Sequence, residues 1–60
     1  MKIFLNGDVC TIEQKITIEK LISSLDIEGK FAIEINQHII PRSKYADTAI
    51  HLGDNIEIVQ

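Results

Sequence analysis

Sixty residues, 45% of them apolar, make one small folded domain, because a disordered segment carries fewer apolar side chains and so short a chain has room for one core. Nine acidic residues against six basic ones give a net charge of −3, which argues against the basic surface of a nucleic-acid-binding protein. The apolar runs are far too short to span a membrane and the single cysteine cannot form an intrachain disulfide, so we expect a cytoplasmic protein.

Residues 1–13 predict a β-hairpin. Its turn is Asn6-Gly7, a preferred pair for a type I′ turn, in which both positions need a positive φ. Because the chain enters the first strand at once, we expect no signal peptide. Folding about the turn gives these pairs: Leu5–Asp8, Phe4–Val9, Ile3–Cys10 and Met1–Ile12. Cross-strand partners share a face, so the core side should hold Met1, Ile3, Leu5, Cys10 and Ile12.

Residues 17–29 predict an amphipathic helix. Thr17 suits the N-cap position, and Gly29 is expected to end the helix. Apolar residues follow the i, i+3, i+4 and i+7 spacing of one helical face: Ile18, Leu21, Ile22 and Leu25.

Residues 30–41 predict a second hairpin. Asn36-Gln37 is expected to form its turn, since asparagine tolerates the left-handed conformation, and Pro41 ends the return strand. The first strand alternates, with Phe31, Ile33 and Ile35 on one side and Ala32, Glu34 and Asn36 on the other.

The rest of the chain predicts a short helical turn and a final strand. We expect the turn within residues 43–49, with Ser43 as its cap. After the turn residues Gly53-Asp54-Asn55, the alternation in residues 56–59 directs the isoleucines to the core and directs Glu57 and Val59 outward.

This order of elements predicts an α+β fold of the β-grasp type, a mixed sheet of about five strands packed on one main helix, as a single domain over residues 1–60. The helix joins the two hairpins across one sheet face, which makes the first and last strands parallel, central neighbours. The expected core is Ile3, Leu5, Ile18, Leu21, Ile22, Leu25, Ile33, Ile35, Ile56 and Ile58.

The opposite sheet face carries the candidate binding residues. If the first and last strands are neighbours, Phe4 and Val59 can form an apolar patch rimmed by Lys2, Glu34 and Glu57. An aromatic residue in an apolar patch is typical of a protein interface, although scattered exposed apolar residues are equally common. The candidate partner-binding residues are Phe4, Val59, Arg42, Ala32 and Glu57.

No catalytic or metal site is expected. Cys10 falls on the core face, where a free cysteine usually fills space, and His38 and His51 lie beside turns without other ligands near them in the pattern. Glu34 and Glu57 are expected on the outer face, on strands that need not be adjacent, as part of a solvated surface. We therefore expect neither a metal nor a bound cofactor.

Several segments together resemble the ThiS family, the ubiquitin-like sulfur carriers of thiamine biosynthesis. They are Lys2-Ile-Phe-Leu-Asn-Gly7, Thr17-Ile18, Ile35-Asn36-Gln37, Ile40-Pro41-Arg42, and Gly53-Asp54 before Ile56-Glu57-Ile58-Val59. The likeness covers essentially the whole chain in order and spacing. Its most specific part is the combination of the Asn36 turn, Pro41-Arg42 and Gly53-Asp54.

The resemblance implies a carrier rather than an enzyme. In the family, an E1-like adenylyltransferase of ThiF type uses ATP to adenylate the carboxylate of a terminal Gly-Gly. Sulfur delivered through a cysteine desulfurase then converts it to a thiocarboxylate, which supplies a thiazole synthase of ThiG type. The glycines here are Gly7, Gly29 and Gly53, so the resemblance implies that the reactive glycine lies beyond Gln60.

Two other functions fit the same fold. The sulfur carriers of molybdopterin synthesis are similar but generally longer, and a binding module of TGS type would be cut from a longer chain. RNA-contacting modules are expected to be basic, whereas acidic residues predominate here. The codons after Gln60 distinguish these possibilities, because Gly-Gly and a stop codon indicate a carrier, whereas a long reading frame indicates a module or a carrier fused to thiazole synthase.

Overall fold

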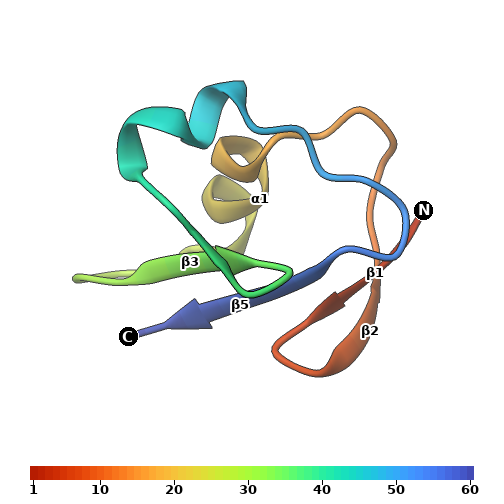
Figure 1. The fold of residues 1–60 in the computed structure, drawn as a ribbon, viewed down its shortest axis with the longest axis horizontal. Coiled ribbons are helices and arrows are strands. Elements are labelled where there is room, and N and C mark those ends of the chain that lie inside the picture. Colours follow the sequence, from red (N-terminus) through yellow and green to blue (C-terminus); the bar gives the residue numbers. More distant parts are fainter.

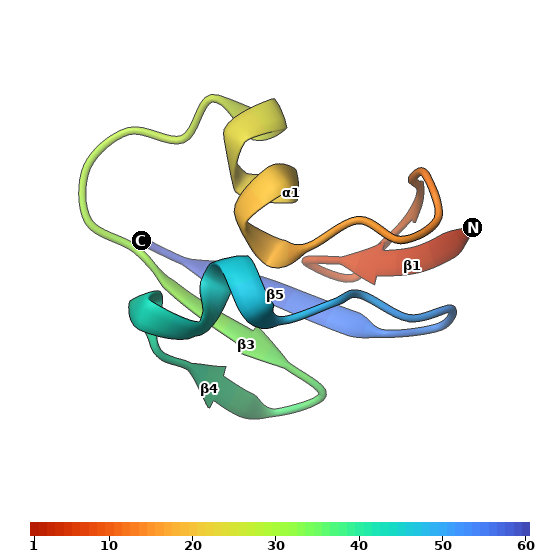
Figure 2. The same cartoon turned by 90° about the horizontal axis from the view of Figure 1, so that it is seen from above.

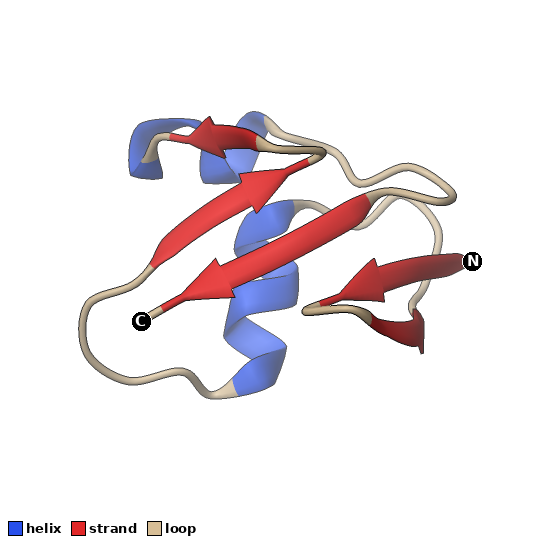
Figure 3. Cartoon of the chain, turned by 60° about the horizontal axis from the view of Figure 1, so that its bottom comes forward, coloured by secondary structure: helices blue, strands red, loops and turns tan.

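The computed structural model describes residues 1–60 and contains a five-stranded mixed sheet with helices on one side (Figures 1 and 2). The strand order is β2-β1-β5-β3-β4, with β5 in the middle, parallel to β1 and antiparallel to β3. The elements are β1 (Lys2–Leu5), β2 (Asp8–Thr11), α1 (Ile18–Leu25), β3 (Ala32–Ile35), β4 (His38–Ile40), the 3₁₀ helix η1 (Arg42–Asp47) and β5 (Asn55–Val59). Figure 3 shows the sheet from the side that α1 does not cover. None of the helices is long and apolar enough to cross a membrane.

Both hairpins form as the sequence predicts. In the first, Phe4 faces Val9 across a turn at Asn6-Gly7 with φ values of 50° and 86°. In the second, Asn36-Gln37 turns with φ values of 51° and 70°, so both turn positions of each hairpin have a positive φ. These turns fix the register, and the register decides which side chains reach the outer face.

Helix α1 begins as expected but ends early. The hydroxyl of Thr17 accepts a hydrogen bond of 3.3 Å from the backbone N–H of Lys20, which is N-capping geometry. The helix stops at Leu25 because Asp26 takes the left-handed conformation (φ 54°), a conformation that aspartate tolerates. The prediction that Gly29 ends the helix is therefore wrong, and Gly29 lies in the connection to β3.

The 3₁₀ helix η1 also differs in detail from the expected helical turn. It begins at Arg42, one residue before the expected cap Ser43, and its N-cap position is held by Pro41 in an extended conformation. No side chain caps it. The first turn is instead held by the backbone N–H of Lys44, which donates to the Pro41 carbonyl at 2.9 Å.

The core lies between the sheet and the helices. Its buried residues are Ile3, Ile18, Leu21, Ile33, Ile35, Ile50 and Ile56, and the expected core residues Leu5, Ile22 and Ile58 are half-buried against them. Leu25, which the helical pattern placed in the core, is the last residue of α1 and is 37% exposed. The prediction missed Ile50. Its N–H donates to the Ile16 carbonyl at 2.9 Å, which draws this segment alongside the start of α1.

Candidate functional site

The uncovered side of the sheet is the candidate functional surface, and the strand registers define it. We call it the outer face. Its residues are joined across the strands by the pairs Lys2–Thr11, Phe4–Val9, Phe4–Asn55, Ala32–Val59, Glu34–Glu57 and Glu34–Ile39. The helices lie on the opposite side of the sheet, so no element of this chain covers these side chains (Figure 2).

On β1, β2, β3 and β5, the apolar side chains of the outer face form two separate groups. Phe4 is 43% exposed and pairs with the still more exposed Val9, and Val59 is 50% exposed and pairs with Ala32. Phe4 is level with Asn55, which precedes Val59 by four positions. Phe4 and Val59 are therefore about 13 Å apart along the strand direction. The expected single patch of Phe4 and Val59 is therefore two groups, with Glu57 between their levels.

Two carboxylates lie directly opposite each other between these groups. Glu34 on β3 and Glu57 on β5 are register partners, because β3 and β5 are adjacent in the sheet. The sequence did not tell whether the strands that carry Glu34 and Glu57 are adjacent, and the structure shows that they are. Neither carboxylate has a lysine or arginine nitrogen within 4.0 Å, since the only ion pair in the structure joins His51 to Asp54.

Ile39 is an outer-face residue that the sequence analysis overlooked. It is 71% exposed and pairs with Glu34, whereas its neighbour Ile40 points to the core side. Alternation along the return strand was the available signal. Arg42 takes no part in the outer face, because it begins η1 on the helix side of the sheet (Figure 1).

A side chain from the first turn holds the end of β5. Asn6 Oδ1 accepts a hydrogen bond of 2.8 Å from the backbone N–H of Ile58, after β1 itself has ended at Leu5. On the other side, Val59 pairs with Ala32. The last residues of β5 are thus extended and fixed from both sides, which sets the direction in which the strand leaves the sheet (Figure 3).

The start of β5 is fixed by the residues that carry the most specific part of the sequence pattern. Asn36 donates from Nδ2 to Asp54 Oδ1 at 3.1 Å and accepts at Oδ1 from the Asn55 N–H at 2.9 Å. The other oxygen of Asp54 accepts the His51 N–H at 2.8 Å. The turn between β3 and β4 is thereby tied to the turn before β5, which explains why these residue types occur at this spacing.

The remaining candidate residues do not assemble a reactive site. Cys10 is free, half-buried and packed against the core, as expected for a space-filling thiol. His38 and His51 are exposed. No three His, Cys, Asp or Glu side chains lie close enough to hold a metal ion.

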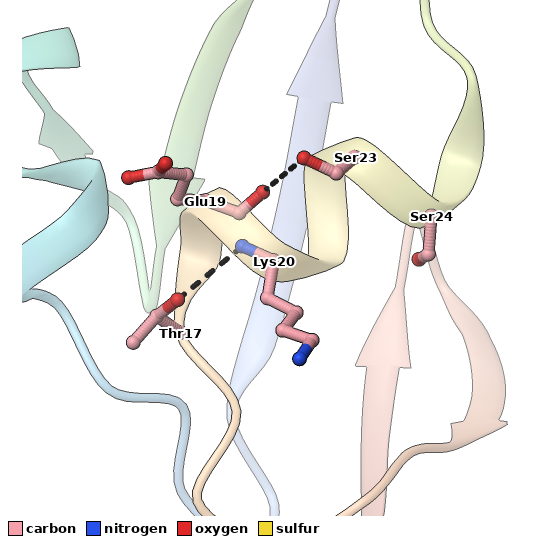
Figure 4. A pocket seen from close by; sticks show the side chains of 5 residues that line it. All are labelled: Thr17, Glu19, Lys20, Ser23 and Ser24. Carbon is pink, nitrogen blue, oxygen red and sulfur yellow. Dashed lines mark hydrogen bonds between the residues drawn. The ribbon is translucent and has the colours of Figure 1, made fainter.

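A polar hollow lies on the surface of α1 and is lined by Thr17, Glu19, Lys20, Ser23 and Ser24 (Figure 4). The hydroxyl of Ser23 donates to the Glu19 carbonyl at 3.1 Å, and that of Ser24 donates to the Leu21 carbonyl at 2.7 Å. With the Thr17 cap, all three hydroxyl side chains that line the hollow are engaged with the helix backbone.

A mixed sheet with a central parallel pair of terminal strands, crossed on one face by one main helix, is the β-grasp architecture, which confirms the expected fold class. The solved structure of a thiamine biosynthesis protein (ThiS) from Geobacter metallireducens superposes with a TM-score of 0.90 at 22% identity, covering 98% of this chain and 91% of that one. The model of the ThiS family matches residues 3–60. The chain belongs to the ThiS family, as its sequence pattern indicated.

One longer relative contains a segment similar to this chain. A thiazole synthase of Paramagnetospirillum magneticum (strain ATCC 700264 / AMB-1) is 38% identical over 60 residues, which are 98% of this chain. The chain spans only 18% of the length of that relative.

Proposed function

We propose that this protein is a sulfur carrier of thiamine biosynthesis and not itself an enzyme. The observation that carries the proposal is the match to the ThiS family over residues 3–60, on a fold that superposes on a ThiS structure. The outer face is consistent with the proposal, because it offers an uncovered surface for docking beside a fixed, extended last strand (Figure 3). The match to ThiS favours the thiamine branch over molybdopterin synthesis and over a TGS-type module.

In the proposed reaction the chain supplies the acceptor carboxylate. A glycine beyond Gln60 carries it, and an E1-like adenylyltransferase of ThiF type joins it to AMP with loss of pyrophosphate. Adenylation turns a poor electrophile into a good one. A sulfide-level nucleophile, HS⁻ or its equivalent, then attacks the carbonyl carbon and forms the C–S bond as the C–O bond to AMP breaks. Glycine suits the tail because it lacks a Cβ and can pass through a narrow channel. The resulting thiocarboxylate is the form in which sulfur is carried.

Docking on the adenylyltransferase is assigned to the outer face. Phe4, Ala32 and Val59 supply apolar contacts, and Glu57 supplies charge. These side chains share the face from which no helix of this chain excludes a partner (Figure 3). Arg42 would contact only a partner that extends past the β4 edge of the sheet to the start of η1.

A thiazole synthase of ThiG type is the proposed recipient of the sulfur. In the Paramagnetospirillum relative, a segment similar to this chain is joined to the remainder of a protein named thiazole synthase. Such a union brings a carrier and its recipient together at high effective concentration. A cytoplasmic location, where ATP and both enzymes would be present, completes the proposal.

The proposal is tested by ATP–pyrophosphate exchange. The natural gene product, incubated with its cognate E1-like enzyme, should make exchange of labelled pyrophosphate into ATP dependent on the carrier. A version that ends at Gln60 should support none, because it presents a glutamine carboxylate held at the end of the sheet. Exchange that is equal with and without the natural product would overturn the proposal.

A further inference from the structure

The opposed pair Glu34–Glu57 occupies the middle of the outer face. The Asn36 N–H donates to the Asn55 carbonyl, so Asn36 and Asn55 form a hydrogen-bonded pair of the ladder. Such pairs recur every second residue, which makes Glu34–Glu57 the next one, with Cα atoms about 5.5 Å apart. Both side chains project from the same face, so the two negative charges are close neighbours.

Folding of this domain gains nothing from the pair. Like charges directly opposite each other on a sheet are destabilising, and no cation of the chain lies within 4.0 Å of either carboxylate to offset the repulsion. Lys2, on the outer side of β1, is remote, because its carbonyl accepts from the N–H of Gly53, which lies two residues before β5 begins and four before Glu57. The pair therefore leaves a local negative charge without a counter-charge.

Apolar side chains surround this charge. Ile39 lies beside Glu34 on β4, and the Ala32–Val59 pair is two positions further along the same strands. On the other flank, Phe4 is level with Asn55, two residues before Glu57. A partner that covers these apolar groups removes water from the carboxylates, which strengthens any charge interaction made there.

From this arrangement we infer that the Glu34–Glu57 pair receives an arginine of the E1-like activating enzyme, whose guanidinium bridges the two carboxylates while apolar side chains of the enzyme cover Phe4, Ile39 and Val59. Arginine fits better than lysine because its planar fork presents several N–H donors, enough for two acceptors at once. We assign this contact to the activating enzyme because it must bind the carrier before any sulfur is added and must bring the carrier's tail to ATP. This inference rests on the proposed carrier function.

The inference makes an unusual prediction, that removing either charge has opposite effects on folding and on binding. Glu34→Gln and Glu57→Gln should each raise the urea midpoint of the natural gene product, because the repulsion is lost. Each should also weaken binding to the cognate enzyme by about tenfold or more in Kd, because a covered guanidinium loses a charged acceptor. The Kd of the variants should depend less on NaCl concentration than that of the wild type.

Glu19→Gln is the matched control. It removes the same charge from the first turn of α1, on the helix side of the sheet, where a carboxylate favours the helix dipole. Its urea midpoint should therefore not rise, and its Kd for the enzyme should equal that of the wild type.

The outcomes separate this inference from the proposed function. If the wild type supports pyrophosphate exchange but both outer-face glutamine variants bind with wild-type Kd and salt dependence, the arginine contact is refuted and the carrier function stands. If affinity falls equally for Glu19→Gln, the effect is general electrostatic attraction and the inference is also refuted. If the wild type supports no exchange, the carrier function itself fails.

Discussion

Truncation of Leu21 tests the packing on which the whole arrangement depends. Leu21 is 3% exposed and lies where α1 meets the sheet, so Leu21→Ala removes buried methyl groups and leaves a cavity. Buried Leu→Ala changes cost about 2–5 kcal/mol. A domain of 60 residues has a free energy of unfolding of about 3–9 kcal/mol, so the loss is a large fraction of the total.

Leu25→Ala on the same helix provides the comparison. Leu25 is 37% exposed at the last helical position, so the same chemical change should cost about 0.5 kcal/mol. Urea unfolding followed by circular dichroism measures both, and with a slope of about 1 kcal/mol per molar urea the Leu21→Ala midpoint should fall by about 2 M or more. Similar midpoints for the two variants would refute the packing described here.

Two further pairs of variants test the turn between β3 and β4 and the proposed docking surface. Asn36→Ala removes two side-chain hydrogen bonds at a position with φ 51° and should cost about 1–3 kcal/mol in urea unfolding. Asn36→Gly removes the same two bonds but adopts the positive φ freely, so it should cost less, and wild-type stability of this variant would show that the side-chain bonds contribute nothing. Phe4→Ala and Val59→Asp should weaken binding to the activating enzyme by about tenfold each in titration calorimetry, with circular dichroism unchanged, because both side chains are exposed on the outer face. Unchanged affinity for both would remove these residues from the interface.

The fold was predictable because its signals are local. The Asn6-Gly7 and Asn36-Gln37 turns set the hairpins, Thr17 sets the helix start, and strict alternation sets which strand residues face inward. These choices agree with one another, so strand order and most of the core followed without long-range information.

The errors in the predicted core arose where the spacing of apolar residues along the chain does not match what the rest of the fold buries. Leu25 continues the apolar spacing of α1, but Asp26 ends the helix and leaves its neighbour partly in water. Ile50 lies in no regular element, and a hydrogen bond to Ile16 brings it into the core. Neither the end of the helix at Leu25 nor the burial of Ile50 can be inferred from the spacing of apolar residues within one element.

The outer face was predictable in composition but not in arrangement. Alternation within each strand is enough to direct Phe4, Glu34 and Glu57 outward. Which of them are neighbours depends on the register between β1, β5 and β3, and β5 is far from both in sequence. The structure thereby separates Phe4 from Val59 and joins Glu34 to Glu57, which changes the surface from an apolar patch to an acidic centre with apolar flanks.

Intact-mass spectrometry tests the central claim, that this protein carries sulfur on its terminal carboxylate. The natural gene product is incubated with its cognate E1-like enzyme, ATP, Mg²⁺ and a sulfur source, and the same reaction without ATP is the control. The carrier should gain the mass difference of one sulfur for one oxygen, located at its terminal glycine, only when ATP is present. An unchanged mass in the complete reaction would contradict the claim.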